Sequence, residues 1–449
     1  MTCAKFALTL TAVVALVGCT NKSSSSNSSS DGSCANATIS PGSITTTTST
    51  NSIPVYVADP GTTGAVGYTN EPLVSVTICT PNHTSGSQCQ TISNVLLDTG
   101  SYGLRLFASA ITSNVNLSQV NVTVQGSTYP LGQCEVFGSG ADWGSVKTAD
   151  VILGSQTASN IPIQVIDYNY AVMPTACQNL QPDTDPCHAG FNGIIGVGVF
   201  AQDCGTDCNS TNTSVNPGNY FACTGSQCFN AYNGACSGGV CAIAVGLSSQ
   251  VINPITQFAT NFNNGLALTM PAVSTNGSSA VQGTLTFGIN STAGDAPGSS
   301  VVVYASDASG MTDGNGMDFR TVYNSTTYGG AGSTQSFLDS GSNGIFFPGG
   351  GSLTLCSGSQ FYCPATTQNL SATIEGYLGA PTVSVNFSIA NTDTLSSTGH
   401  TAFNNLGGQQ TTIFDWGLPF FFGHTVFVGF DGQAATYNSG PATGPYWAF

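Results

Sequence analysis

Two aspartates stand in segments of almost the same sequence, and they are the side chains best suited to carry out chemistry. Asp98 lies in residues 95–101 (VLLDTGS), and Asp339 lies 241 positions later, in residues 337–342 (FLDSGS). Two carboxyl groups that a fold brings face to face cannot both ionise readily, so they share a proton and titrate as a pair. Such a pair supplies one general base and one general acid around a single bound water. The repeat therefore predicts acid–base chemistry on an activated water.

The residues around each aspartate are suited to hold its carboxylate rigidly. Each segment is an apolar run, the aspartate, a small hydroxyl residue, a glycine and a serine, and a second apolar run follows. This order places the aspartate on a tight loop between two buried strands. Glycine permits the turn and the close approach of another backbone, while the hydroxyls can hydrogen-bond the loop and the carboxylate. The supporting residues predicted in this way are Thr99, Gly100, Ser101, Ser340, Gly341 and Ser342.

The composition indicates which elements must position these loops. The 449 residues are 40% hydrophobic but only 6% charged, and they include 55 glycines. Long amphipathic helical stripes are absent, and Ser, Thr and Asn are abundant. Many short strands joined by turns have this character, and the hydrophobic content is too high for a disordered chain. We therefore expect an all-β protein.

The charge balance excludes some classes of partner. Five basic residues stand against 21 acidic ones, and one of the five, Lys5, lies in a segment that we expect to be removed. The remaining four give the mature chain a net charge of −17. Such a surface repels nucleic acid and acidic membranes. We therefore expect no nucleic-acid partner.

The 16 cysteines indicate export to an oxidising compartment. Cys34 and Cys134 have no close neighbour in the sequence and could pair with each other. The alternative for the cysteines between 204 and 241 is a zinc site, but the Cys-x2-Cys spacing that zinc sites favour does not occur there. Spacing suggests the neighbouring pairs Cys79–Cys89, Cys177–Cys187, Cys204–Cys208, Cys223–Cys228, Cys236–Cys241 and Cys356–Cys363.

The N-terminal residues have the features of a lipoprotein signal. An apolar run over residues 6–17 is too short to span a bilayer, and residues 16–19 (LVGC) resemble a bacterial lipobox. We predict a signal peptide over residues 1–18, lipidation of Cys19, and a Ser/Thr-rich tether over 19–52. Thr20 in place of aspartate favours anchoring in the outer membrane. The alternative is an ordinary signal peptide, in which Cys19 is incidental.

Further segments, in the same order, resemble the pepsin family of aspartic peptidases. Besides the two aspartate loops, residues 137–144 (FGSGADWG) resemble the flap of these enzymes. Segments 192–198 and 416–421 resemble the two strands that cross behind the aspartate loops, and 251–262 resembles the helix after the first crossing. Segments 78–81, 283–288 and 426–431 resemble further strands. The whole chain also resembles an uncharacterised family of bacterial lipoproteins.

The resemblance implies a bilobal pepsin-like fold, with lobes over residues 53–290 and 291–449 and a Cys-rich insertion at about 200–245. It implies an endopeptidase that works at acid pH, with Asp98 and Asp339 as its catalytic pair and a peptide or protein as its substrate. The flap residues would be Phe137, Gly138, Ser139 and Gly140. No metal or organic cofactor is implied, and we expect a monomer.

Three departures from the family pattern bear on this interpretation. Phe137 replaces the flap tyrosine, and Arg105 replaces the tryptophan that hydrogen-bonds it. Asp415 stands in the second crossing, where an apolar residue is expected. Strand alternation predicts that Arg105 points outward into solvent. Alternatively, its charge stacks on the Phe137 ring and favours the ionised form of Asp98.

These departures leave a second function open. The chain could be a catalytically inactive pepsin-fold surface protein that binds peptide or glycan, with Asp98 and Asp339 as structural turn residues.

Overall fold

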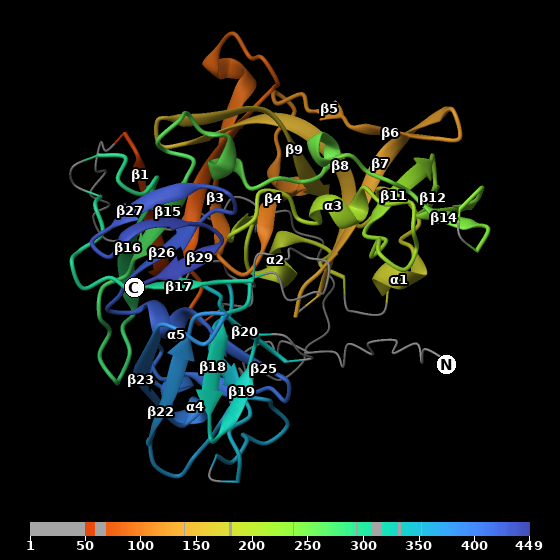
Figure 1. The fold of residues 1–449 in the computed structure, drawn as a ribbon. Helices are drawn as coiled ribbons and strands as arrows, with labels where there is room; N and C mark the ends of the chain where they lie inside the picture. Colours follow the sequence, from red (N-terminus) through yellow and green to blue (C-terminus); the bar gives the residue numbers. More distant parts are fainter. Residues whose placement is uncertain are drawn as a thin grey trace.

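The structure is a computed structural model, and strands dominate it (Figure 1). It describes residues 50–58, 69–138, 140–178, 182–236, 238–292, 295–307, 317–330, 334–351 and 353–449. Within these ranges no α-helix exceeds five residues. The predicted all-β fold of two lobes is confirmed.

The larger part of the molecule is built on one extensive sheet, which occupies the upper part of Figure 1. Its 17 strands are β1 (Ser52–Ala58), β2 (Leu73–Cys79), β3 (Cys89–Asp98), β4 (Tyr102–Phe107), β5 (Ser118–Gln119), β6 (Asn121–Val124), β7 (Ser127–Val136), β8 (Ala141–Leu153), β9 (Gln156–Ile166), β10 (Gly193–Val197), β11 (Tyr220–Thr224), β12 (Gln227–Phe229), β15 (Gly265–Thr269), β16 (Ala280–Phe287), β17 (Val303–Ala305), β26 (Thr425–Gly429) and β29 (Tyr446–Ala448).

The smaller part, below it in Figure 1, contains two four-stranded sheets. One joins β19 (Thr326–Tyr328), β18 (Arg320–Tyr323), β22 (Gln368–Glu375) and β23 (Thr382–Ile389), and the other joins β20 (Gln335–Leu338), β25 (Ile413–Trp416), β21 (Ile345–Phe347) and β24 (Gly407–Gln409). Two hairpins, β13 (Ala231–Asn233) with β14 (Val240–Ala242) and β27 (Ala434–Tyr437) with β28 (Gly440–Thr443), complete the strands. The α-helices are α1 (Thr175–Gln178), α2 (Pro186–Ala189), α3 (Gly205–Cys208), α4 (Thr392–Ser396) and α5 (Leu418–Phe421).

Apolar residues explain why the strands beside the first aspartate loop form a core. Every residue of β4 and β10 is buried, and Leu97, Leu104 and Ile195 have no exposed surface. Strands buried on both faces carry continuous apolar runs rather than alternation. The loop that bears Asp98 is therefore anchored in the rigid interior of its lobe.

The two crossing strands lie where the sequence resemblance implies. β10 runs parallel to β3, with Gly196 opposite Asp98, and β25 runs parallel to β20, with Trp416 opposite Leu338. The expectation of a helix over residues 251–262 is wrong. The chain forms only a 3-10 turn, Pro254–Gln257, because the backbone is extended at Phe258, with ψ of 170°, and left-handed at Asn261, with φ of 83°, and a helix continues through neither conformation.

Five of the expected disulfides form, and two expected pairs are wrong. The six disulfides within the described residues are Cys79–Cys89, Cys134–Cys177, Cys204–Cys208, Cys223–Cys228, Cys236–Cys241 and Cys356–Cys363. Cys134 pairs with Cys177 rather than Cys34, because the turn after β9 brings α1 against β7, and the two Cα atoms are 5.9 Å apart. Cys187, the expected partner of Cys177, is disulfide-bonded as well. All six cysteines between 204 and 241 are bonded in pairs, which leaves no thiolate there for zinc.

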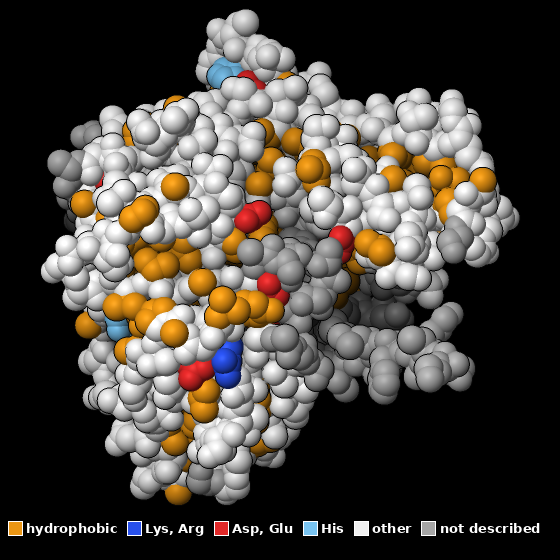
Figure 2. Space-filling model, viewed as in Figure 1, with side chains coloured by type: hydrophobic (Ala, Val, Ile, Leu, Met, Phe, Trp, Pro, Cys, Tyr) orange, Lys and Arg blue, Asp and Glu red, His pale blue; other side chains and the backbone are white. Residues whose placement is uncertain are grey.

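The face of the molecule in Figure 2 carries few charged side chains. Within the described residues, no helix has the length and apolar character needed to cross a membrane. The disulfides indicate a domain that folds outside the cytoplasm. Cys19 and the predicted signal and tether lie outside the described residues, apart from the last positions of the tether, where β1 begins.

Candidate active site

Asp98 and Asp339 occupy equivalent positions in the two halves of the fold. Asp98 ends β3, and the chain enters β4 at Tyr102. Asp339 directly follows β20, and β21 begins at Ile345. Each aspartate therefore lies on a tight loop between two strands, and a crossing strand runs behind each loop.

Asp98 is held by its own loop. The backbone N–H of Gly100 donates a hydrogen bond to Asp98 Oδ1 over 2.7 Å, and the Ser101 hydroxyl donates one to Oδ2. The residue is only 6% exposed. Both carboxylate oxygens are therefore fixed in direction before any substrate binds.

The second loop repeats these contacts. The N–H of Gly341 donates to Asp339 Oδ1 over 2.8 Å, and the Ser342 hydroxyl donates to Oδ2 over 2.9 Å. The N–H of Ser342 also donates to Oδ1, over 3.2 Å. The two loops thus share a structure as well as a sequence.

The loops also bind each other through reciprocal hydrogen bonds. The N–H of Thr99 donates to Ser340 Oγ over 3.0 Å, and the N–H of Ser340 donates to Thr99 Oγ1 over 2.9 Å. The Thr99 hydroxyl donates to the Leu338 carbonyl over 3.1 Å, and the Ser340 hydroxyl donates to the Leu97 carbonyl over 2.7 Å. Thr99 and Ser340 are fully buried, so these four bonds are shielded from water. They fix the separation of the two aspartates.

Glycine is required where the loops meet. A Cβ atom on Gly100 would lie 2.5 Å from Cγ of Asp339, and one on Gly341 would lie 2.8 Å from Cγ of Asp98. Each carboxyl therefore packs directly on the glycine of the opposite loop. This close approach brings the two carboxyls face to face.

The electrostatics of the pair favour a shared proton. Burial raises the pKa of Asp98 well above its usual range, and the charge of Asp339 and a hydrogen bond between the two side chains raise it further. The Ser101 hydroxyl and the Gly100 N–H act in the opposite direction. Asp98 thus keeps a proton at pH values where an exposed aspartate has lost it. One protonated and one ionised carboxyl is the arrangement that general acid–base chemistry needs.

Phe137, Gly138 and Gly140, three of the predicted flap residues, lie where the β7–β8 hairpin turns. β7 pairs with β8 up to Val136 and Ala141, and the N–H of Phe137 donates to the Gly140 carbonyl over 2.8 Å. Phe137 is half-buried and Gly138 is exposed, whereas Ser139 lies outside the described residues. The turn is therefore narrow and carries an aromatic ring at its base.

The expectation that Arg105 points into solvent is wrong. Arg105 is 1% exposed, and its Nη2 lies 2.9 Å from Asp203 Oδ2 and 3.1 Å from Glu135 Oε2. Alternation does turn Arg105 away from the core that contains Leu104, but the Cys-rich insertion covers that side of β4. Its guanidinium carbon also lies 5.8 Å from the centre of the Phe137 ring, which is within reach of a cation–π contact.

A buried polar network joins Arg105 to the insertion. The Tyr220 hydroxyl donates to Asp203 Oδ1 over 2.7 Å, and the Gln133 amide donates to Asp203 Oδ2. Burial raises the pKa of Glu135 to about 7, although Arg105 lowers it, and burial likewise raises the pKa of Asp203. Arg105 therefore has two carboxylates of its own to balance its charge.

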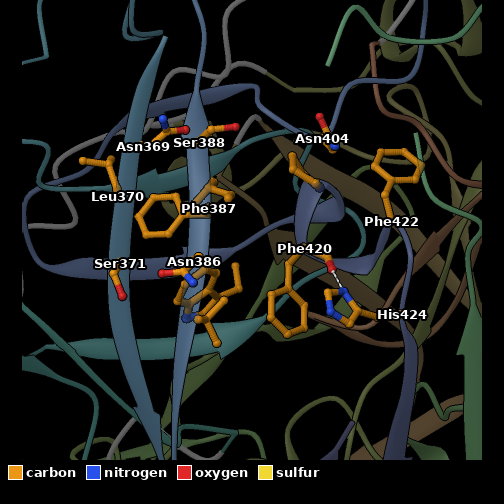
Figure 3. Close-up of a pocket in the computed structure, with 14 residues that line it drawn as sticks. Asn369, Leu370, Ser371, Asn386, Phe387, Ser388, Asn404, Phe420, Phe422 and His424 are labelled. Atoms are coloured by element: carbon orange, nitrogen blue, oxygen red, sulfur yellow. Dashed lines mark hydrogen bonds between the residues drawn. The ribbon is translucent and has the colours of Figure 1, made fainter. Parts of the chain in front are cut away.

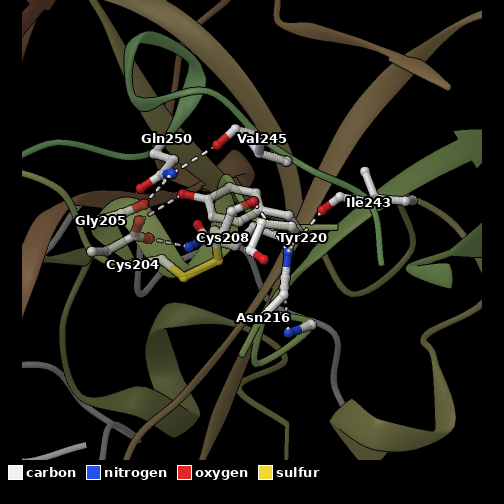
Figure 4. The surroundings of a disulfide bond; sticks show 12 residues. Cys204, Gly205, Cys208, Asn216, Tyr220, Ile243, Val245 and Gln250 are labelled. Atoms are coloured by element: carbon white, nitrogen blue, oxygen red, sulfur yellow. Dashed lines mark hydrogen bonds between the residues drawn. A yellow bond between two sulfur atoms is a disulfide. The ribbon is translucent and has the colours of Figure 1, made fainter. Parts of the chain in front are cut away.

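A disulfide fixes the segment that supplies Asp203. Cys204–Cys208 closes one turn around α3, next to the ring of Tyr220 (Figure 4). The Gln250 amide donates to the carbonyls of Gly205 and Val245, each over 2.8 Å. The partners of Arg105 are thus built into a rigid support.

Sequence reasoning missed Glu135, Asp203 and Tyr220, and it noted Asp415 only as a departure from the family pattern. Asp415 is 7% exposed and lies on the crossing strand β25. For Tyr220 and Asp415 a signal was available, since a polar residue within a buried apolar strand needs a partner.

A separate cavity of about 560 Å³ opens in the smaller part of the molecule. Figure 3 shows it between the β22–β23 hairpin, which contributes Phe387, and the segment of Phe420 and Phe422. His424 Nδ1 donates to the Phe420 carbonyl over 2.6 Å. No residue that the sequence predicted as part of the site lines this cavity.

Comparisons with known proteins give a family but no activity. A family model described as "Protein of unknown function (DUF3443)" matches residues 47–449. Among solved structures, the aspartic proteinase from Irpex lacteus is similar, with 16% sequence identity and a TM-score of 0.48. That similarity covers 88% of this chain and 96% of the other. No curated protein matches the sequence.

Proposed function

The chain belongs to the DUF3443 family, and we propose that it is an aspartic endopeptidase whose catalytic pair is Asp98 and Asp339. The observation that carries this proposal is the mutual hydrogen bonding of two equivalent aspartate loops. That arrangement packs each carboxyl against the glycine of the opposite loop and holds both in place. A pair of structural turns would not need such symmetry.

The chemistry follows from the shared proton. The ionised carboxyl removes a proton from a water held between the pair, and the water oxygen bonds to the scissile carbonyl carbon. The protonated carboxyl donates its proton to the carbonyl oxygen, which gives a neutral tetrahedral intermediate. The C–N bond then breaks. The leaving nitrogen takes the proton from the carboxyl that deprotonated the water, while the other carboxyl takes a proton from a hydroxyl of the intermediate, which becomes the carboxylic acid product. The pair returns to its original state with one proton.

The loops contribute by holding the charges in place before reaction. The bonds from Ser101 and Ser342 orient the carboxylates, and the bonds between Thr99 and Ser340 prevent the loops from separating. Groups that are already oriented need no reorganisation when charge develops in the transition state. The raised pKa of Asp98 favours work at acid to neutral pH.

The substrate would be a peptide in extended conformation. Such a segment can pair its backbone with the edge of the β7–β8 hairpin, as strand addition does elsewhere. The described part of the flap carries Phe137 and the exposed Val136, so apolar side chains would contact it. We also propose that Cys19 is lipidated and anchors the chain in the outer membrane.

The proposal is tested by assaying cleavage of an unfolded protein across the acid range. Asp98→Asn and Asp339→Asn should each lower kcat/KM roughly a thousandfold or more, because the pair acts as a unit. Asp393→Asn is the matched control, since Asp393 is an exposed acid on α4. If either dyad variant keeps most of the wild-type rate, the catalytic pair is not Asp98 with Asp339.

A pepsin-fold protein that binds without cleaving is the second candidate. Phe137 favours it, because a phenyl ring cannot make the hydrogen bond of the family's flap tyrosine. A peptide inhibitor that mimics the tetrahedral intermediate separates the two functions. Tight binding of that inhibitor together with measurable turnover supports the peptidase, whereas equal binding of inhibitor and uncleaved peptide supports the second candidate.

A further inference from the structure

The two crossing strands differ at one position that lies beside the catalytic pair. Gly196 stands opposite Asp98 in the first half, and Gly417 occupies the corresponding place behind Asp339. Two residues before each glycine, the first half has Ile194 and the second has Asp415. Both are buried, with 3% and 7% of their surface exposed. The internal symmetry thus marks Asp415 as an acid in a place where the fold accepts an apolar side chain.

The strand geometry places Asp415 on the same side of its sheet as Asp339. Phe414 and Trp416, its neighbours in β25, pack together in an aromatic cluster with ring centres 4.7 Å apart, so the Asp415 side chain points to the opposite face. Asp415 pairs with Phe337 in register, and Asp339 follows Phe337 by two residues, on the same face. The N–H of Asp339 donates to the Trp416 carbonyl over 3.2 Å, which holds this register at the aspartate itself.

The surroundings of Asp415 contain acids and a hydroxyl. The negative charges of Asp339 and Asp98 act on its carboxyl, and the Ser342 side chain lies within hydrogen-bonding reach of it. Its Oδ1 atom is buried and has no hydrogen-bond partner among the residues that the structure describes. In the same part of the chain, the ion pairs of His83, Arg105 and Arg320 go to other acids.

We propose that Asp415 is a third carboxyl of the catalytic centre, a positioning residue that acts on Asp339 through Ser342 and sets the upper pH limit of the reaction. This inference rests on the proposed function. Ser342 already donates its one hydroxyl proton to Asp339. A protonated Asp415 can therefore donate to Ser342 Oγ and complete a chain of hydrogen bonds that ends on the Asp339 carboxylate.

The effect on pH dependence follows from the order of ionisation. Burial raises the pKa of Asp415 well above its usual range, and the negative charges of Asp339 and Asp98 raise it further. In acid Asp415 is therefore neutral. When Asp415 ionises at higher pH, its negative charge disfavours loss of the last proton from the pair. The pair therefore keeps its active, singly protonated state to a higher pH.

The first test is the dependence of kcat/KM on pH for Asp415→Asn and Asp415→Ile. Asparagine keeps an N–H donor for Ser342 but carries no charge, so the alkaline limb should move down by about one pH unit while the acid limb stays. Isoleucine, the residue that the first half tolerates, also removes the donor, so kcat in acid should fall by about tenfold as well. Asp393→Asn should leave the profile unchanged. A profile of Asp415→Asn that superimposes on the wild type overturns the proposal.

The second test does not depend on catalysis. A carboxyl whose pKa is raised by folding stabilises the protein fully below its unfolded pKa of about 4, and that stabilisation disappears as the pH rises through the folded value. The melting temperature of Asp415→Asn should therefore rise relative to wild type between about pH 4 and pH 7. A constant difference between the two proteins shows that Asp415 does not titrate as proposed. If the wild type cleaves no peptide but the melting temperatures differ as expected, only the peptidase function is contradicted.

Discussion

Replacing Arg105 by alanine probes the support of the flap, and its effect should depend strongly on pH. The guanidinium is 1% exposed and pairs with Asp203 at 2.9 Å and with Glu135 at 3.1 Å. It also donates to the Tyr102 carbonyl over 2.8 Å. Removing one partner of a buried ion pair leaves an uncompensated charge, which costs about 3–5 kcal/mol. We expect a loss of that size in the free energy of unfolding near neutral pH.

In acid the same substitution should cost less. Burial raises the pKa of Glu135 to about 7 and raises that of Asp203, and Arg105 opposes both shifts. A carboxyl with a raised folded pKa stabilises the protein below its unfolded pKa of about 4 and loses that effect as the pH rises through the folded value. Without Arg105 the pKa values of both carboxyls in the folded state rise further, so the loss in free energy of unfolding grows with pH. Near pH 4 we expect a loss of only about 1–2 kcal/mol, from the cation–π contact and the lost hydrogen bonds.

Urea unfolding at the two pH values measures this difference. Arg320→Ala is the matched control, because Arg320 is 32% exposed and lies 3.5 Å from Glu375. A partly exposed ion pair of that kind contributes about 0–1 kcal/mol to the free energy of unfolding. Adding Asp203→Asn to the Arg105 variant should restore part of the loss at neutral pH. Equal losses in the two arginine variants, or a loss that does not change with pH, would refute the reasoning. In a peptidase assay the Arg105 variant should also raise KM, since Phe137 loses its partner.

Four further predictions follow from the loops, the N-terminus and the buried acids. Gly100→Ala should lower kcat/KM at least about a hundredfold, because its Cβ would lie 2.5 Å from Asp339 Cγ. A fully active alanine variant would show that Asp339 does not pack against residue 100. Ser340→Ala should lower the free energy of unfolding by about 1–3 kcal/mol, because the buried N–H of Thr99 loses its acceptor. Ser340→Thr keeps a hydroxyl and should retain most of the wild-type stability. Urea unfolding of both variants measures the difference, and equal losses would contradict the role of this hydroxyl. Mass spectrometry of the mature N-terminus should find Cys19 with acyl chains, and an unmodified cysteine or another start would disprove lipidation. The melting temperature of the wild type should rise as the pH falls from about 7 to about 4. A melting temperature that is highest at neutral pH would contradict this prediction.

The local features of the site could be predicted from the sequence because they are encoded within a few residues. The aspartate, hydroxyl and glycine of each loop determine its turn, and the apolar runs on either side form the buried strands. The repeat of that pattern also indicated that Asp98 and Asp339 belong together. Their hydrogen-bonded contact depends on atoms of both loops, and the structure alone supplies its geometry.

Features that depend on distant segments could not be predicted. The alternation of residues along the strand correctly predicted that Arg105 points away from the core that contains Leu104. It carries no information about which segment covers the other face of the strand. That segment contains Asp203, 98 residues away. The Cys134–Cys177 disulfide spans 43 residues for the same kind of reason, since α1 reaches β7 only in the folded chain. Short spacing in the sequence correctly predicted the disulfides that close within one turn or hairpin. It failed for Cys134–Cys177, which joins two separate elements.

The placement of the few charges connects stability to the proposed chemistry. On the face in Figure 2 uncharged side chains cover most of the surface, whereas nine acids are buried among the described residues: Glu71, Asp98, Asp142, Asp150, Asp203, Asp207, Asp307, Asp318 and Asp415. Acids are normally exposed, and acid usually unfolds proteins because their paired carboxylates have lowered pKa values. Here burial raises the pKa values of Asp98, Asp142, Asp203 and Asp415, so folding takes up protons. Because the protonated carboxyls that stabilise the fold include that of Asp98, acid conditions that preserve the structure also preserve the proton that the proposed reaction needs.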